Sequence, residues 1–440
     1  MDLQDWIPEG AHRWRLPPRD GRSAAVLALA SEPLLRGMDE RLRQQACSLA
    51  RWPGIVSPVC LMPDAHWGDG FALGVVVAFD DREGGVVSPA GAGVDVSCGV
   101  RCLLANLERA QVMERRMALA DALAATVAAG TGSGGAGRLD ADGVEAMLQG
   151  GALWAVEQGW GYPEDLLHCE EHGHLDGADA AAVSEQAKRR HGDGLGIPGS
   201  GHHAVEVRWV AELFNPPLAA LMGLRLGGVA VMIRGGSGGL GHQVGSDYRQ
   251  QMLEAAPQHG LQPDHRDLAC APIRSPLGQR YLGAMQAAIN GAFANRQLLS
   301  HRVREVFSRL WPDAELGLLI DLSHHSFTLE DHLVGHDSRR LYVHRNGATR
   351  AYGPGHGTLP DPFGRTGQPV LVGGGMGASS YVLAGLDSSE ALAFSSACRG
   401  PLGGTHGAGR DVDVDAVVIA TEQAGLAQRV ARLEPLINIP

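Results

Sequence analysis

Asp95 and Cys98 lie three residues apart in the glycine-bounded segment PAGAGVDVSCGVRC (89–102). In a tight turn, a carboxylate and a thiolate at this spacing can point at one cation, and a thiolate can also bridge two metal ions. An ordinary turn with a buried cysteine fits the same segment. The two residues are therefore candidate metal ligands that need further donors from elsewhere in the chain.

Two histidines and a glutamate stand where a glycine-rich loop runs into an apolar strand, in GIPGSGHHAVEV (196–207). A lone histidine is more often a core or surface residue, whereas the pair His202 and His203 followed by Glu206 is also a metal-ligand pattern. Both interpretations stay open for this segment.

A second histidine pair, His324 and His325, ends a predicted buried strand in DLSHHSF (321–327). The end of a strand is a good position for metal ligands, and Asp321 is a candidate to orient them through a hydrogen bond. Together, one aspartate, one cysteine and several histidines favour Mn²⁺, Fe²⁺, Co²⁺ or Zn²⁺ over Mg²⁺ or Ca²⁺.

Glycine-dense segments at 234–245, 347–357 and 373–381 could cradle anions with their backbone N–H groups, although a purely structural role is an alternative. In THGAGR (405–410), His406 is followed by small residues and then by Arg410. This arrangement could expose the imidazole to a phosphorus centre while the arginine clamps phosphate oxygens.

Composition narrows the chemistry further. The chain has 440 residues, a net charge of −12 and a single lysine, Lys188, so there is no general basic field for nucleic acid and no Gly-Lys-Ser/Thr phosphate loop. Covalent chemistry on lysine would have to use Lys188, which lies in what resembles a solvated helix end. A histidine therefore remains as the candidate covalent carrier.

The location of the protein can also be predicted from composition. The seven cysteines are scattered and odd in number, which favours a reducing compartment over a disulfide framework. No apolar run approaches the roughly 20 residues of a membrane helix, and the start MDLQDWIPEG lacks the pattern of a secretory signal. We therefore expect a cytoplasmic protein without a membrane partner.

Hydrophobic periodicity predicts an α/β chain in which glycine-rich loops follow several strands. The predicted helices cover 33–50, 108–129, 142–157, 178–190, 281–311 and 413–435. The predicted strands cover 75–79, 86–87, 100–104, 227–233 and 315–322. We expect 335–377 to be irregular because it is rich in Gly, Pro and Arg.

The residues of these motifs and their order along the chain resemble the RtcB family of RNA ligases over about residues 55–410. The matching segments are MPDAHWGDG, GVDVSCG, GSGHHAVEV, GSGGLGHQVG, ACAPIRSPLGQ, NGAFANRQ, DLSHHS, VHRNGATRA, GQPVLVGGGMGASSYVL and HGAGR. The resemblance implies an α/β (α+β) fold with mixed sheets and surrounding helices in one large catalytic domain, 55–440. Residues 1–54 would form an N-terminal extension that packs on this core.

The resemblance also implies an activity. In that family a manganese site transfers GMP from GTP to a histidine, and the enzyme then joins an RNA 3′-phosphate or 2′,3′-cyclic phosphate to a 5′-hydroxyl, as in tRNA splicing and RNA repair. The implied cofactors are GTP and one or two Mn²⁺ ions, and the implied partners are RNA ends, with room for an accessory activator protein.

Matched to the family's motifs residue by residue, the site falls into three groups. The implied metal ligands are Asp95, Cys98, His203 and His324, and the implied guanylylated nucleophile is His406. The implied nucleotide-binding residues are His202, Glu206, His325, Gly374, Gly375, Met376, Ser380, Gly407 and Arg410. Arg345 and Arg350 lie in a segment expected to touch nucleotide or RNA.

The chain departs from the family's pattern at several positions. Arg234 replaces a metal-binding histidine, and His202 and His325 each replace an asparagine. A guanidinium stays protonated and cannot be a ligand, so we hypothesise one metal ion, with Arg234 supplying the charge of the second. By spacing, Arg399 rather than His406 would fall at the nucleophile position. The family usually ends in a glycine-flanked lysine that reads guanine, whereas this chain ends LINIP, so the choice of nucleotide stays open.

Two other functions fit the same residues. One is a metal-dependent phosphoesterase that has lost guanylylation, and the other is a non-catalytic protein that binds RNA ends around a structural metal ion. The lost histidine ligand and the lost terminal lysine favour these alternatives, whereas the retained Asp95, Cys98, His203, His324 and HGAGR segment favour the ligase.

Overall fold

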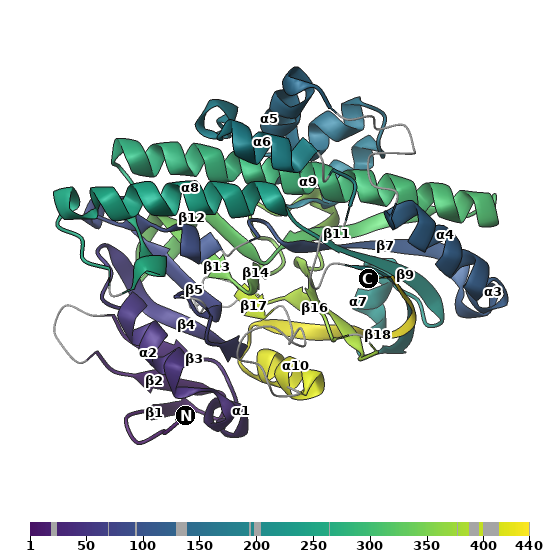
Figure 1. Cartoon of the computed structure of the whole chain (residues 1–440). Coiled ribbons are helices and arrows are strands. Elements are labelled where there is room, and N and C mark those ends of the chain that lie inside the picture. The colour runs from purple at the N-terminus through teal and green to yellow at the C-terminus, as the bar shows by residue number, and fades with distance from the viewer. Residues whose placement is uncertain are drawn as a thin grey trace.

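The protein was analysed as a computed structural model of the 440-residue chain. The structure describes residues 1–18, 24–68, 70–92, 95–128, 139–192, 195–197, 204–263, 265–375, 377–386, 396–398 and 413–439. Two seven-stranded sheets lie next to each other, and the long helix α9 runs across both of them on one side, with α8 beside it over the first sheet (Figure 1). The mixed α/β fold in one large domain that the sequence predicts is confirmed.

The first sheet contains the N-terminal strands and a hairpin from the middle of the chain. In spatial order its strands are β1 (Ile7–Gly10), β2 (Arg13–Leu16), β3 (Val26–Ala28), β4 (Ile55–His66), β5 (Leu73–Phe79), β13 (Asp337–Asn346) and β12 (His325–Val334). β3 pairs with β4 in parallel, so residues before 55 continue the same sheet. The domain boundary at residue 54 stays a prediction.

The second sheet is built from distant parts of the chain, and its strand pairs are antiparallel. In spatial order its strands are β11 (Leu316–Ser323), β7 (Gly99–Glu108), β9 (Gly228–Gly235), β8 (Ala204–Leu213), β18 (Ala427–Ile439), β16 (Ser380–Gly385) and β15 (Pro369–Val372). Two small sheets pair β6 (Val86–Val87) with β10 (Ala271–Pro272), and β14 (Ala348–Arg350) with β17 (Ser396–Cys398).

The helices cover the sheets on both sides (Figure 1). They are α1 (Glu32–Gly37), α2 (Glu40–Leu49), α3 (Arg109–Glu114), α4 (Arg116–Ala128), α5 (Ala141–Glu157), α6 (Glu185–Gly192), α7 (Pro216–Leu221), α8 (Gly239–Ala255), α9 (Pro276–Leu310) and α10 (Val414–Gln423). Ser275 caps the N-terminus of α9, because its side chain accepts a hydrogen bond from the Gly278 N–H. Pro276 is the first helical residue, a position where the missing N–H costs nothing.

None of the helices in the described ranges combines the length and the apolar character that a membrane crossing requires.

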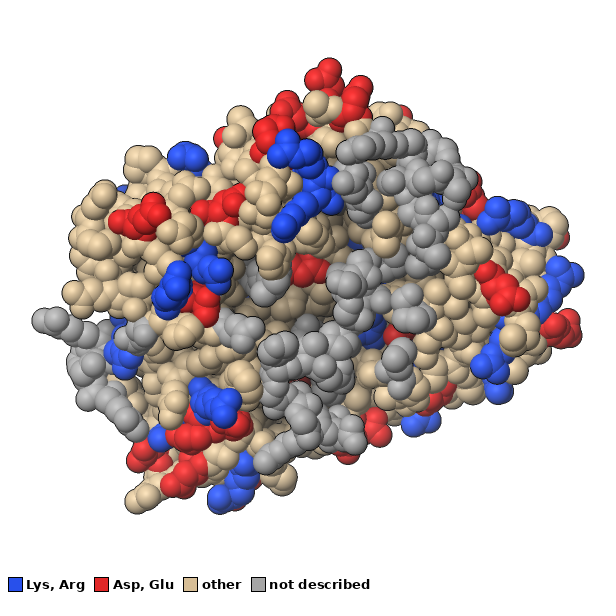
Figure 2. Space-filling view, viewed as in Figure 1, with Lys and Arg blue, Asp and Glu red and all other residues tan. Residues whose placement is uncertain are grey.

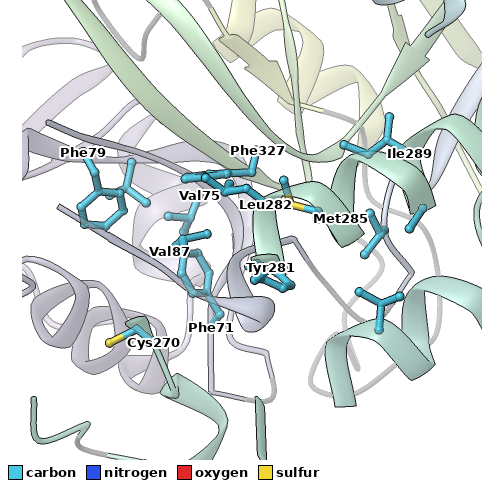
Figure 3. Packing of buried hydrophobic residues seen from close by; sticks show 14 of the residues in the cluster. Phe71, Val75, Phe79, Val87, Cys270, Tyr281, Leu282, Met285, Ile289 and Phe327 are labelled. Atoms are coloured by element: carbon cyan, nitrogen blue, oxygen red, sulfur yellow. The ribbon is translucent and has the colours of Figure 1, made fainter. Parts of the chain in front are cut away.

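An apolar cluster fills the space between β5, β6, β12 and α9. Figure 3 shows Phe71, Val75 and Val87 from the sheet side together with Tyr281 and Leu282 of α9. The side chains of Phe71, Val75 and Tyr281 are almost fully buried, so this packing fixes the position of α9 over the first sheet.

A buried carboxylate ties α9 to the second sheet. Asp321 at the end of β11 accepts hydrogen bonds from Arg101 Nε of β7 (3.0 Å) and Arg296 Nε of α9 (2.6 Å). All three side chains have no exposed surface. Asp321 therefore pairs with two arginines instead of orienting the neighbouring histidines, the role suggested by its sequence position.

Two segments differ from their predicted structure. The range 335–377 was expected to be irregular, but β13 pairs on both sides and alternates exposed Arg340 with buried Leu341. The predicted helix 413–435 ends at Gln423, where Gly425 has φ +74°, and β18 follows. β13 pairs with its hairpin neighbour β12 and with the distant β5, and β18 pairs with β16 and the distant β8. Local periodicity does not reveal the distant pairings. The other predicted elements agree with the structure within a few residues, except that 178–190 contains the short helix α6 rather than a full-length one.

The Asp321→Asn substitution tests how much the buried carboxylate contributes to the free energy of unfolding. It leaves Arg101 and Arg296 buried with a neutral partner, and breaking such a cluster costs about 3–5 kcal/mol. We expect a clearly lower urea and thermal midpoint at pH 7. The matched control is Asp331→Asn on β12, whose side chain is 71% exposed and which should lower stability by less than about 1 kcal/mol. Equal midpoints for the two variants would contradict the role given to Asp321.

Candidate functional site

The turn from Asp95 to Cys98 is fixed to the junction between β11 and β12. The Ser97 N–H donates to the His325 carbonyl (2.8 Å), and the His324 N–H donates to the Cys98 carbonyl (2.9 Å). Ser97 has φ +56°, a conformation that a residue with a Cβ adopts only when its surroundings enforce it. Arg296 adds a hydrogen bond from Nη1 to the Ser97 carbonyl (2.7 Å). These contacts bring two segments more than 220 residues apart into one site.

Three metal-binding side chains meet at this junction. His324 Nε2 lies 3.2 Å from Cys98 Sγ, and one donor atom each from Cys98, His324 and His325 all lie within 4.8 Å of one another. Ligands of one first-row metal ion are separated by roughly 3–4 Å, because each bond measures about 2.0–2.3 Å. Both histidines are buried, and Cys98 is half-buried. The three side chains need little movement to hold one ion.

The orientation of His325 is set by Asn346 at the end of β13. Asn346 Nδ2 donates to the Ala72 carbonyl (2.9 Å), so its Oδ1 faces the other way and contacts His325 Nδ1 at 2.6 Å. Only a protonated Nδ1 can make this hydrogen bond, so Nε2 carries the lone pair. A hydrogen bond that fixes the tautomer in this way is typical of metal-binding histidines.

Asp95 lies beside the three donors but is not part of the compact group. Its Oδ1 accepts hydrogen bonds from the Gly238 N–H (2.7 Å) and from Ser237 Oγ (3.3 Å). A Cβ at Gly236 would come within 2.5 Å of the Asp95 carboxylate. The loop after β9 therefore holds this carboxylate closely, and glycine at 236 is required by the close approach.

Arg234 occupies the centre of a second, ionic cluster at the end of β9. Its guanidinium is almost fully buried, lies 3.6 Å from Glu206 Oε2 of β8 and donates to the Gly374 carbonyl (3.2 Å). Arg208 Nε also donates to Glu206 Oε2 (2.9 Å). Glu206 therefore lies between two guanidiniums, and this corner of the site carries a net positive charge.

The glycine loop 373–377 lies directly on Arg234. A Cβ at Gly373 would come within 2.5 Å of the Arg234 guanidinium, so only glycine fits there. The loop is held by the Gly374 N–H, which donates to Ser380 Oγ (3.2 Å), and by Arg208, which donates to the Ala378 carbonyl (2.9 Å). Ser380 is fully buried and Gly375 is half-buried. The structure thus places the predicted nucleotide loop next to Glu206 and Arg234.

Two arginines of the segment 343–351 form buried ion pairs. Arg345 is fully buried and donates to Glu330 Oε2 (2.9 Å) and Ser396 Oγ (2.7 Å). Burial opposes the ionisation of Glu330, but Arg345 and a hydrogen bond from His332 lower the pKa of this carboxyl well below its ordinary value. Arg350 pairs with Glu171 (2.6 Å) and is mostly buried. The expectation that this segment touches nucleotide or RNA stays a prediction.

Several predicted site residues lie outside the described residues. They are His202, His203, Met376, Arg399, His406, Gly407 and Arg410. Sequence reasoning missed Asn346 and Arg208, which position His325 and Glu206. Their signal was weak, since each is one polar residue in an otherwise ordinary strand.

Comparison with known proteins agrees with this arrangement. The family model described as "tRNA-splicing ligase RtcB" matches residues 45–413. The chain is 43% identical over 404 residues to the tRNA-splicing ligase RtcB of Thermococcus kodakarensis, covering 90% of this chain and 82% of that protein. It is 42% identical over 427 residues to the RNA-splicing ligase RtcB of Mycobacterium tuberculosis, covering 89% and 99% of the two chains. It is also 38% identical over 466 residues to the tRNA-splicing ligase RtcB of Archaeoglobus fulgidus, covering 97% and 96%.

The family model spans most of the chain, and the relatives are 38–43% identical over most of its length. The protein therefore belongs to the RtcB family.

Proposed function

We propose that this protein is an RNA ligase that uses GTP and Mn²⁺ to join RNA 3′-phosphate or 2′,3′-cyclic phosphate ends to 5′-hydroxyl ends. The observation that carries the proposal is the meeting of Cys98, His324 and His325 beside the loop 373–377 and Arg234. Family membership supports the same activity, since the related proteins are named RNA- or tRNA-splicing ligases.

The donor set fits a first-row transition metal. One thiolate and two imidazoles are too soft for Mg²⁺ or Ca²⁺, which prefer oxygen ligands. Asp95 and His203 are further candidate ligands from neighbouring segments. When bound, Mn²⁺ would polarise phosphate oxygens and offset their negative charge.

Arg234 is proposed to take the place of a second metal ion. Its guanidinium keeps its charge under all physiological conditions and presents N–H donors that suit phosphate oxygens. Glu206 and the Gly374 carbonyl hold it in place, and Arg208 in turn donates a hydrogen bond to Glu206. A fixed, buried positive charge at this position would stabilise the triphosphate. The protein would then need no further side chains to hold a second metal ion.

The nucleotide is proposed to lie against the loop 373–380. Gly374, Gly375, Met376 and Ser380 would surround it from one side, and His202 and Glu206 from the other, whereas His325, which the resemblance implies as a nucleotide contact, would hold the metal ion. Glycine-rich backbone can approach phosphates closely and offers N–H groups to them. Gly407 and Arg410 would contact the nucleotide from the segment that carries the nucleophile.

The reaction is proposed to proceed through His406. A ring nitrogen of His406 attacks the α-phosphorus of GTP, a P–N bond forms, and pyrophosphate leaves. The GMP group then passes to the RNA 3′-phosphate, which frees the histidine. The 5′-hydroxyl of the second RNA end attacks this activated phosphate, loses its proton, and GMP leaves as the phosphodiester bond forms.

Guanylylation provides the direct test of this proposal. After incubation with Mn²⁺ and GTP labelled at the α-phosphate, we expect acid-labile label on the wild type and on Arg399→Ala but none on His406→Ala. Cys98→Ser should also be unlabelled because it removes the sulfur ligand. Label retained in His406→Ala and lost in Arg399→Ala would contradict His406 as the nucleophile and place the labelled residue in the segment around Arg399. An unlabelled wild type that still binds metal would favour a phosphoesterase or an RNA-end-binding protein.

Metal content tests the role of Arg234 independently of activity. After reconstitution with Mn²⁺ and removal of free ion, we expect close to one ion per wild-type chain and a higher value for Arg234→His, which restores a nitrogen ligand. In the Co²⁺ form, a near-ultraviolet thiolate-to-metal band should be present in the wild type and absent from Cys98→Ser. A value near two ions per wild-type chain would contradict the proposed substitution of charge for metal.

A further inference from the structure

A groove of about 660 Å³ lies outside the metal site, between α2 and the loop that joins β4 to β5. Its lining includes Arg41, Arg51, Trp67 and His265. Arg41, Arg51 and His265 are exposed, and the guanidinium of Arg41 lies 4.7 Å from the centre of the Trp67 ring. The volume falls within the roughly 300–1,000 Å³ of ordinary ligand pockets.

The described lining of the groove is mostly basic, although the protein is acidic overall. Among the described residues, it contains Arg41, Arg43, Arg51 and His265 but one carboxylate, Asp267, which pairs with Arg249 (2.6 Å) and with His265 (3.1 Å). Arg43 pairs with Asp5 (3.0 Å) and with Glu40, whereas Arg41 forms no ion pair within the described part of the chain and lies on Trp67. Figure 2 shows one face of the molecule, on which basic side chains lie both beside acidic ones and in small groups of their own.

The groove is connected to the metal site by the same loop. Gly68 exchanges two hydrogen bonds with the Gln45 side chain of α2 (2.6 and 3.1 Å). Gly70 has φ +83° and packs so tightly that a Cβ would lie 2.6 Å from Asp267 Cβ. Two residues further on, the Ala72 carbonyl holds Asn346, which orients His325. Gly70 and Ala72 can be at most about 7 Å apart, so residues that border the groove lie close in the chain to residues that border the metal site.

We infer that this groove, defined by Arg41, Arg51, Trp67 and His265, binds the single-stranded RNA that leads to the end held at the metal site. The inference rests on the proposed RNA ligase function. Phosphates would be attracted by the arginines, and a base would stack on the Arg41–Trp67 pair, because guanidinium planes and aromatic rings both accept stacked bases without regard to sequence. The occupant is thus RNA, bound with marked salt dependence.

RNA affinity tests the inference on the full chain. We expect Arg41→Gln and Trp67→Leu to weaken binding of a fluorescent single-stranded RNA with a 3′-phosphate about five- to tenfold at 0.1 M salt. Arg41→Gln should also reduce the salt slope by roughly one. The matched control is Arg36→Gln on α1, an exposed arginine outside the groove, which should leave affinity within twofold. If the tryptophan variant is unstable, Arg41→Gln alone decides the outcome.

A second readout locates the RNA. Cys47 lines the groove and Cys98 lies at the metal site, and these are the two half-buried cysteines, the other five being buried. We expect RNA to slow alkylation of Cys47 several-fold in the wild type but not in Arg41→Gln, with peptide mass spectrometry as the measurement. Unchanged affinity in Arg41→Gln together with an unshielded Cys47 would overturn the inference and favour an acidic protein as the occupant.

Guanylylation separates this inference from the proposed function. The groove variants should be labelled by GTP like the wild type, because the groove does not touch the nucleotide loop. A wild type that is not labelled, but whose RNA affinity depends on Arg41, would contradict the ligase proposal and still support RNA binding in the groove. Normal labelling, with an RNA affinity that does not depend on Arg41 and Trp67, would contradict RNA binding in the groove and still support the ligase proposal.

Discussion

The pairing of Asp321 with Arg101 and Arg296 is the constraint on which the site depends. Three elements meet there with no exposed surface, and a charge buried in this way is tolerated only when it is closely paired. Nη1 of Arg296 donates to both the Ser97 and the Gly235 carbonyls (2.7 and 3.0 Å). The ion cluster therefore fixes both the turn that carries Cys98 and the end of the strand that carries Arg234.

A second property of the site is that neutral or charged neighbours hold its side chains in place. Asn346 orients His325, and Arg208 and Arg234 enclose Glu206. The thiol of Cys169 accepts a hydrogen bond from Arg101 (3.1 Å) and, because burial raises the pKa of Cys169 to about 12, it stays neutral there. Such neighbours hold the donors in place before any ligand binds, which lowers the cost of binding.

Arg234 places a fixed positive charge at the end of β9, beside Glu206 and Gly374. A guanidinium cannot exchange with solvent as a metal ion can, so its charge and position are permanent features of the fold. Its position also depends on Gly373, which leaves no space for a side chain. The sequence GGGMG and the arginine at 234 are therefore physically linked, since a residue with a Cβ at 373 would collide with the guanidinium.

The sequence by itself determined the fold class, most helices and strands, and the family, because these depend on local periodicity and on ordered motifs. It grouped Cys98 with His324, which lie 3.2 Å apart, although their binding of metal stays a prediction. The tertiary structure alone decided that His325 joins them. Neighbouring residues in a strand point to opposite faces, but His324 lies in the break between β11 and β12, so both rings can face Cys98.

Tertiary structure also decided that Arg345 is buried against Glu330 and that 335–377 contains paired strands. Arg345 and Glu330 lie on the two strands of the β12–β13 hairpin, whereas β5, the other partner of β13, is far away in the chain. Local residue patterns carry no information about such a distant partner.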